Sequence, residues 1–346
     1  MDRAKEGVDV AASMADVAAL AGVSQRTVSN VVRGYVHVRP ETRQRVQAAM
    51  EELRYRPNAS ARALRASRTG IIALAVPYFA QPYFAELAEH VQRVAAREGL
   101  TLLMDQTGAD PQREALVLDG YRTHVIDGLI FSPMALTAAD MRRQAPDLPM
   151  VLLGEEVHDS SFVTVAIDNV AAAREATAHL LSIGRRRIGV IGADLGTLRG
   201  GAARGRLTGF LEAHAAAECA VHPGLLRAST EWFRSSGYSA TTDLLDERIE
   251  FDALLCLNDV LAIGALRALV ERKVTIPDDV AVVGWDDVDE AAYTTPSLTS
   301  VCPDKAAIAE AAVAQLLEQI AGSRPETTDI TCAHSLRLRE STGEHP

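Results

Sequence analysis

The chain has 346 residues, of which 48% are hydrophobic and 23% are charged, and its formal net charge is −11. This length is enough for two or three units that each bury a core, which argues against a largely disordered chain. The apolar residues form no uninterrupted run of membrane-spanning length, and the first seven residues lack the apolar segment of a secretory signal. We therefore expect a soluble, cytoplasmic protein without a membrane partner. The wide spacing of the four cysteines predicts core thiols and no metal site: Cys219, Cys256, Cys302 and Cys332.

Charge is distributed unevenly along the chain. Residues 1–69 contain 12 Lys and Arg against 7 Asp and Glu, whereas the remainder contains 23 against 39. A basic segment can approach phosphates while an acidic remainder stays clear of them. This asymmetry favours a nucleic-acid contact in the first segment.

Two short helices joined by a glycine turn are predicted in that segment. Ser13 can accept a hydrogen bond at a helix start, and Asp16 stands three residues later, so a helix is predicted over residues 14–20. Gly22 supplies the backbone freedom of a tight turn, and Ser24 caps the second helix. Helix, short turn and helix is the order of a helix-turn-helix motif.

The second predicted helix has an apolar side formed by Val28, Val31 and Val32. Arg pairs with guanine, and Gln or Asn with adenine, because each offers two hydrogen-bonding atoms, whereas short hydroxyls suit phosphate oxygens. The polar side and the start of the helix carry such groups, namely Ser24, Gln25, Arg26, Thr27, Ser29 and Asn30. An ordinary solvent-exposed face of a helical pair is the alternative interpretation.

Residues 15–32 and 42–58 closely resemble the start of the lactose-repressor (LacI/GalR) family, and the resemblance then covers nearly the whole chain. It implies a bacterial transcription regulator whose second helix lies in the major groove of DNA. Gln25, Arg26 and Asn30 would be its base readers.

The resemblance also implies that His37 lies in a loop beside the DNA. Two residues depart from the family pattern. Asn30 differs from the residues most often seen at that position, which leaves the operator sequence open. Arg39 replaces the small hydroxyl residue that commonly caps the third helix, so Pro40 must begin that helix without the cap. As an alternative role, Arg39 contacts a phosphate.

Residues 57–69 form a polar joint rich in Ala and Arg that is too short to be a stable helix alone. In the resembled family this segment is the hinge helix, which folds in the minor groove as a pair across the dimer axis. The resemblance implies that Ala61 and Leu64 contact DNA there, with Leu64 wedged into the central base step. A packing residue in a linker is the alternative role for Leu64.

After Gly70, short apolar runs alternate with helical patterns. The runs predict buried strands near residues 71–76, 100–104, 128–131, 150–153, 188–191, 253–257 and 280–283. Helices are predicted between them, near residues 84–97, 171–183, 238–245 and 260–271. This order is typical of an α/β fold with parallel sheets buried on both faces.

Six separated segments of this body match the resembled family, at residues 81–84, 167–169, 184–188, 205–210, 258–265 and 283–287. The implied fold is a small all-α helix-turn-helix head with a hinge helix, joined to an α/β two-lobed domain of the periplasmic-binding-protein-like type I class. Three strands would cross between the lobes, near residues 163–167, 298–301 and 328–331.

The expected organisation has three parts. Residues 1–56 form the DNA-binding head, residues 57–69 the hinge, and residues 70–346 the effector-binding and dimerisation domain. Within that domain we expect a first lobe of about residues 70–165 and 301–328, and a second of about residues 166–299 and 329–346.

Several matched segments end strands or open helices, where clefts form in α/β sheets. A sugar has hydroxyls that both donate and accept, which suits Asp, Asn and Arg, and aromatic faces pack on its C–H surface. The candidate effector-binding residues are therefore Tyr83, Phe84, Arg206, Trp232, Asn258 and Asp286. As alternatives, Asn258 and Asp286 serve as helix caps and Trp232 is a core aromatic.

These observations predict a sequence-specific, DNA-binding repressor that acts as a homodimer on a pseudo-palindromic operator. A small-molecule effector, most simply a carbohydrate, would release it from DNA. A purine-type regulator that needs its ligand to bind DNA is one alternative, and a small-molecule binding protein without a regulatory DNA role is another. No catalytic residues, metal or cofactor are expected.

Overall fold

The computed structural model describes residues 12–32, 35, 37–55, 68–121, 126–145, 147–154, 161–193, 201–229, 231–323 and 329–343. The chain divides into two compact units, residues 1–69 and 70–346. Most of the expected hinge, including Ala61 and Leu64, lies outside the described residues.

The first unit contains three helices around a small core. They are α1 (Met14–Ala21), α2 (Gln25–Val32) and α3 (Pro40–Glu52). The core uses one apolar side of each helix, and its buried residues are Val17, Ala18, Ala21, Val28, Val31, Val46 and Ala49. The predicted helices of this segment are confirmed, and so is the inward orientation of Val28 and Val31.

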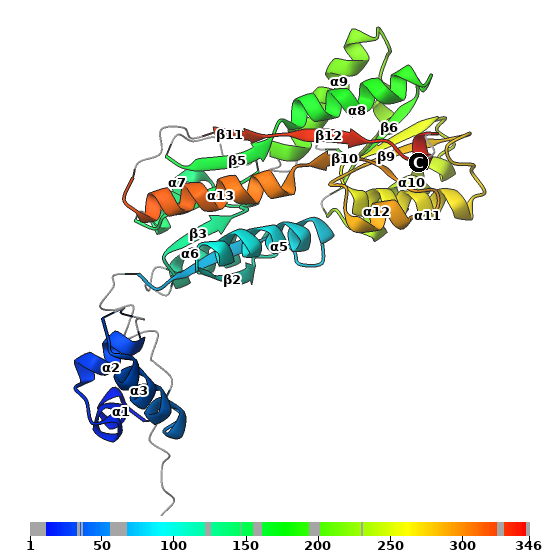
Figure 1. Ribbon diagram of the computed structural model, residues 1–346. Coiled ribbons are helices and arrows are strands. Elements are labelled where there is room, and N and C mark those ends of the chain that lie inside the picture. Colours follow the sequence, from blue (N-terminus) through cyan, green and yellow to red (C-terminus); the bar gives the residue numbers. More distant parts are fainter. Residues whose placement is uncertain are drawn as a thin grey trace, which may run out of the picture. The chain divides into compact units, whose positions relative to one another are not determined.

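The second unit is built from two α/β lobes (Figure 1). The first lobe contains β1 (Ile71–Val76), α5 (Pro82–Arg97), β2 (Thr101–Gln106), α6 (Pro111–Tyr121), β3 (Gly128–Phe131), α7 (Ala138–Gln144), β4 (Met150–Leu153), β5 (Val163–Ile167), α13 (Lys305–Ile320) and β11 (Asp329–Cys332). The second contains α8 (Asn169–Ser182), β6 (Ile188–Ala193), α9 (Gly201–Ala216), β7 (Leu226–Ala228), α10 (Arg234–Asp246), β8 (Ala253–Cys256), α11 (Asp259–Glu271), β9 (Ala281–Trp285), α12 (Asp289–Tyr293), β10 (Thr299–Pro303) and β12 (His334–Arg337).

Each lobe has one six-stranded sheet with helices on both faces. The strand order is β11-β5-β4-β3-β1-β2 in the first lobe and β12-β10-β9-β8-β6-β7 in the second. All pairs are parallel except β10 with β12. In the first lobe α5 and α13 pack together on one face, and in the second lobe α8 pairs with α9 and α10 with α11. The predicted α/β architecture is confirmed.

The chain crosses between the lobes three times, after β5, after β10 and between β11 and β12. Two expected lobe boundaries were wrong. Residues 329–332 form β11, which pairs in parallel with β5, so they belong to the first lobe and not to the second. Residues 301–303 belong to β10 of the second lobe, because Val301 pairs with Trp285 of β9.

The expectation that strands are buried on both faces fails at the edge strands β2, β7, β11 and β12, of which β2 is the clearest case. β2 ends the first sheet and pairs only with β1, and Leu103 and Met104 on it are 37% and 46% exposed. An edge strand keeps one side open to solvent even in a parallel sheet.

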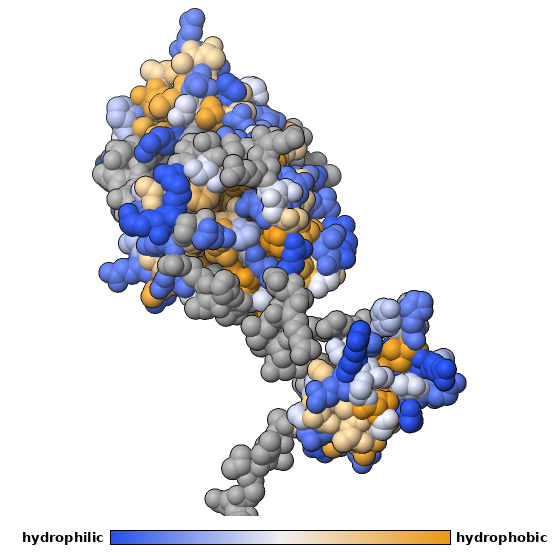
Figure 2. All heavy atoms as spheres, turned by 90° about the vertical axis from the view of Figure 1, so that its left-hand side faces the viewer, coloured by the Kyte–Doolittle hydropathy of each residue, from blue (hydrophilic) through white to orange (hydrophobic). Residues whose placement is uncertain are grey.

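Hydrophilic and hydrophobic residues are interspersed on the face of the larger unit shown in Figure 2. Among the described residues, no helix is long and apolar enough to cross a membrane. Within the same part of the chain, His, Cys, Asp and Glu form no cluster that would hold a metal ion.

Candidate functional site

The turn between α1 and α2 is fixed by short polar contacts. The Asp16 N–H donates to Ser13 Oγ at 3.3 Å, and the Ser13 N–H donates back to the Asp16 carboxylate at 2.8 Å, which forms a complete capping box. Gly22 follows α1 with a φ of 63°, a left-handed conformation that glycine adopts without strain. The Thr27 N–H then donates to Ser24 Oγ at 3.1 Å and starts α2.

The side of α2 opposite its valines is available for contacts. Ser24, Gln25 and Arg26 are exposed, and Ser29 and Asn30 are half-buried. Thr27 is also half-buried, and its hydroxyl lies 2.9 Å from Ser24 Oγ. This side can offer a cation and several amides and hydroxyls to a binding partner.

The connection to α3 carries His37, which is exposed and packs edge-to-face on Tyr35 with ring centroids 5.3 Å apart. Arg43 of α3 donates to the Tyr35 carbonyl at 2.8 Å and so holds this connection in place. As expected, Arg39 makes no side-chain cap, and α3 begins at Pro40 without one.

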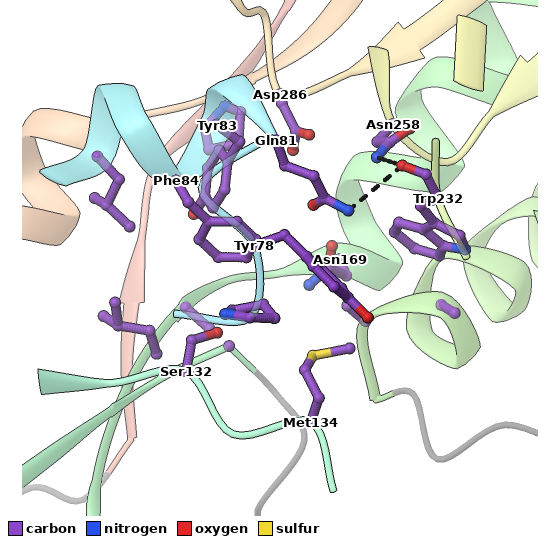
Figure 3. A pocket seen from close by; sticks show the side chains of 18 of the residues that line it. Tyr78, Gln81, Tyr83, Phe84, Ser132, Met134, Asn169, Trp232, Asn258 and Asp286 are labelled. Atoms are coloured by element: carbon purple, nitrogen blue, oxygen red, sulfur yellow. Dashed lines mark hydrogen bonds between the residues drawn. The ribbon is translucent and has the colours of Figure 1, made fainter. Parts of the chain in front are cut away.

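A cavity of about 340 Å³ lies between the two lobes of the larger unit, at the carboxyl ends of their strands (Figure 3). All six candidate effector-binding residues line it: Tyr83, Phe84, Arg206, Trp232, Asn258 and Asp286. The first lobe contributes mainly apolar and aromatic side chains, such as Tyr78, Phe84, Met134, Leu153 and Val165. The second lobe contributes the charged groups and, apart from Gln81 of the first lobe, the amide groups.

Arg206 is the most firmly held of the polar groups. Its Nε donates to Asn169 Oδ1 at 2.7 Å, and its Nη1 donates to the Leu257 carbonyl. The guanidinium lies 4.1 Å from the ring centroid of Trp285 and 5.4 Å from that of Trp232, a cation–π arrangement with both rings. A buried arginine held in this way presents a fixed cation to the cavity.

Asp286 follows β9 and is only 7% exposed. Burial raises the pKa of its carboxyl to about 7, although the nearby cations Arg206 and Lys305 oppose that rise. Burial is also the largest cause of the raised pKa of the Tyr83 phenol, and the Asp286 charge adds to it. The cavity therefore contains a carboxyl group that ionises near neutral pH.

The mouth of the cavity brings the lobes into contact. Asn258 Oδ1 accepts from the Leu261 N–H at 2.8 Å and caps α11, while its Nδ2 donates to the Trp232 carbonyl at 3.4 Å. Gln81 of the first lobe donates to the same carbonyl at 3.4 Å, as Figure 3 shows. Beside it, Tyr78 packs edge-to-face on Phe233 of the second lobe.

One wall of the cavity depends on a buried carboxylate. Glu114 is fully buried and accepts from the N–H groups of Met134, Ala135 and Leu136 at 2.8 to 3.2 Å. Burial nevertheless raises the pKa of Glu114, with these bonds acting in the opposite direction. Glu114 thereby fixes the segment that places Ser132 and Met134 on the cavity.

Comparisons with known proteins identify the family. The model described as "Bacterial regulatory proteins, lacI family" matches residues 13–58, and the model described as "Periplasmic binding protein-like domain" matches residues 177–342. The HTH-type transcriptional repressor PurR of Klebsiella pneumoniae (strain 342) is 32% identical over 338 residues, which is 97% of this chain and 98% of that repressor. The chain belongs to the LacI family.

Solved structures of LacI-family proteins share this architecture. A lac repressor dimer bound to operator and the anti-inducer ONPF has a TM-score of 0.83 at 26% identity, over 96% of this chain and 99% of that one. A regulator from Sanguibacter keddieii DSM 10542 is 44% identical with a TM-score of 0.74, over 80% of this chain and 100% of that one. A CelR–cellobiose complex is 30% identical with a TM-score of 0.70, over 95% of this chain and 99% of that one.

As a LacI-family member, the chain is a DNA-binding repressor regulated by an effector, and the family is not one of enzymes. The prediction of a regulator without catalytic activity is therefore confirmed.

Four residues that support the cavity were not among the candidates. Asn169 stands in a matched segment, but its contact with Arg206 spans 37 positions, and no local pattern indicates it. Gln81 and Trp285 also stand in matched segments, each directly before or near a candidate. Glu114 lies in α6, and its sequence neighbours give no sign that it is fully buried.

Proposed function

We propose that this LacI-family repressor binds a carbohydrate in the cavity between its lobes and leaves its operator when the carbohydrate binds. The observation that carries the proposal is the group of polar side chains on the second lobe. Arg206, Asn258 and Asp286 line one cavity, and none of them is more than 9% exposed. Sugar hydroxyls donate to a carboxylate and accept from guanidinium and amide groups, so all three suit such a ligand.

The aromatic rings support the same ligand class. Phe84 and Tyr78 on the first lobe and Trp232 on the second line the cavity. The C–H face of a pyranose packs on such rings, while its hydroxyls reach the polar side. Among the family's solved structures, the CelR complex contains cellobiose.

A purine-type ligand that strengthens DNA binding is the second candidate. The 32% identity with PurR over nearly the whole chain favours it. A flat base would stack on Phe84 or Trp232 and pair with Arg206 and Asp286. The two candidates differ in ligand class and in the sign of the coupling between ligand and DNA.

For DNA, we propose that Gln25, Arg26 and Asn30 read bases, that Ser24, Thr27 and Ser29 contact phosphates, and that His37 lies beside the duplex. We also propose that Ala61 and Leu64 contact the minor groove. The support is the helix-turn-helix geometry of the head and the exposure of the polar side of α2. A single head reads only a short half-site, so the repressor would act as a homodimer on a pseudo-palindromic operator.

The test of the ligand is a thermal-shift screen of the full chain against sugars, including cellobiose, and against adenine, guanine and hypoxanthine. An operator is first selected from random duplex DNA, and each stabilising compound is then titrated into the protein–operator complex in a gel shift. The proposal expects a sugar that raises the melting temperature and releases DNA. A purine that tightens the complex, with no active sugar, would contradict it and support the second candidate.

The test of base reading is Arg26→Ala in the same gel shift. Loss of a bidentate base contact should relax preference at one base pair of each half-site, at a cost of about 1 to 3 kcal/mol. Unchanged discrimination among operator variants would remove Arg26 from the base readers.

A further inference from the structure

The turn that carries Asp286 belongs to the second lobe but is held by two side chains of the first lobe. Lys305, the first residue of α13, donates through Nζ to the carbonyl oxygens of Asp286 at 2.5 Å and Asp287 at 3.0 Å. Glu86 of α5 accepts from the Asp289 N–H, at the start of α12, at 2.9 Å. Glu86 and Lys305 also form an ion pair at 2.8 Å.

These contacts are largely shielded from solvent. The Lys305 side chain is 10% exposed and that of Glu86 is 27% exposed. A hydrogen-bonded ion pair in this setting is screened less than a surface pair and has a more restricted geometry. By comparison, an ion pair between Arg97 of α5 and Glu310 of α13 joins the same two helices at 3.0 Å, with both side chains 61% exposed. These two residues do not hold the turn that carries Asp286.

The second lobe anchors the opposite side of the same turn. The Asp287 N–H donates to Ser300 Oγ at 3.0 Å, and the Val288 N–H donates to Asp259 Oδ2 at 2.9 Å. Arg339 pairs with the Asp287 carboxylate at 2.7 Å. The backbone here is unusual, because Asp286 and Asp287 have φ values of 106° and 46°. Non-glycine residues hold such values only where surrounding contacts enforce them.

The turn thus has three attachments. Its amide groups and one carboxylate are fixed within the second lobe, its carbonyls and the next helix start are fixed to the first lobe, and the Asp286 side chain lines the cavity. Any change in the position of Asp286 must alter at least one of these attachments. The contact with the first lobe is the one that changes when the lobes move relative to each other.

We propose that Lys305 and Glu86 are positioning residues that set the orientation of Asp286 and link its contact with the effector to the angle between the lobes. This link rests on the proposed function of the cavity as the effector site. A ligand shifts a conformational equilibrium only by its different affinity for the two states. Lys305 and Glu86 supply that difference, because Asp286 is correctly placed only in the lobe arrangement that keeps both contacts.

The first experiment needs no effector. The chain contains two tryptophans, of which Trp285 is fully buried and Trp232 lines the cavity. Quenching of tryptophan fluorescence by acrylamide in the full chain therefore reports on Trp232 and on opening between the lobes. The variants are Lys305→Met and Glu86→Gln, Lys305→Arg as the conservative replacement, and Arg97→Met as the matched control on the same two helices.

We expect Lys305→Met and Glu86→Gln to raise the acrylamide quenching constant roughly twofold, because the closed arrangement loses a lobe contact and its population falls. Lys305→Arg keeps the cation, so its quenching constant should stay close to that of the wild type, and Arg97→Met should match the wild type. Circular dichroism verifies folding, and Glu86→Gln decides the result if Lys305→Met does not fold. Unchanged quenching in a folded variant would overturn the proposal, whereas a failed ligand screen would leave this readout intact.

A second readout separates positioning from general stability. Asp286 is surrounded by Arg206 of α9, Lys305 of α13, Glu86 and Tyr83 of α5, and Asp259 of α11, and Lys305 lowers the pKa of Asp286. Removing that cation should raise the midpoint of the pH titration of tryptophan fluorescence from about 7 by about one pH unit. Lys305→Arg should keep the wild-type midpoint. A midpoint that Lys305→Met leaves unchanged would show that Lys305 does not act on Asp286.

Discussion

Replacing Asp286 with Asn should stabilise the protein at alkaline pH. Burial raises the pKa of Asp286 from 3.8 to about 7, and this difference corresponds to about 4 kcal/mol between the protonated and ionised forms. Between about pH 4 and pH 7 the folded chain retains a proton that the unfolded chain has released. The free energy of unfolding therefore falls as the pH rises through this window. The amide of Asn does not ionise, so burial of this side chain costs the same free energy at every pH. Asn also tolerates the positive φ of this position.

The stability gap between Asp286→Asn and the wild type should widen by about 3 kcal/mol from pH 5 to pH 8, since most of the titration lies between these values. Urea unfolding followed by tryptophan fluorescence measures this gap in the larger unit, which holds both Trp232 and Trp285. Asp246→Asn is the control, because Asp246 is 58% exposed and its pKa is lowered by Arg272. A gap that is the same at both pH values would refute the reasoning.

Three further changes test other parts of the molecule. Arg206→Met removes the donor to Asn169 Oδ1 and to the Leu257 carbonyl. The free energy of unfolding in urea should therefore fall by about 3 kcal/mol. A variant as stable as the wild type would mean that these bonds contribute no net stability. Ser24→Ala removes the acceptor of the Thr27 N–H and should cost about 1 kcal/mol in thermal melting of the head, and an unchanged melting temperature would contradict that role. From the family resemblance, Leu64→Ala should weaken operator binding in gel shifts but spare salt-sensitive binding to random DNA, and equal loss on both would argue against the wedge.

Local patterns predicted the head and most strands of the body. The Ser13 and Asp16 pair, Gly22 and Ser24 each act over four residues or fewer, so the sequence alone is enough to place α1 and α2. The strands at 71–76, 128–131 and 150–153 were predicted with their observed bounds, because each is a short, continuous apolar run.

The contacts that organise the cavity could not be predicted in the same way. Lys305 lies 19 positions from Asp286, and Glu86 lies 203 positions from Asp289. Only the packing of α5 against α13 and the crossings between lobes bring such residues together. The assignment of residues 329–332 failed for the same reason, because a four-residue strand next to a crossing has no local feature that identifies its sheet.

The two sides of the cavity should differ in how they control ligand choice. The three polar candidates of the second lobe line the cavity and are also held by structural contacts: Arg206 donates to Asn169, Asn258 caps α11, and the backbone of Asp286 is fixed by Lys305. Such preorganisation lowers the cost of binding, but a substitution there also costs stability. Met134 and Leu153 of the first lobe line the cavity with apolar side chains. Exchanges among apolar residues at those two positions should therefore change the size of the accepted ligand while keeping the polar recognition intact.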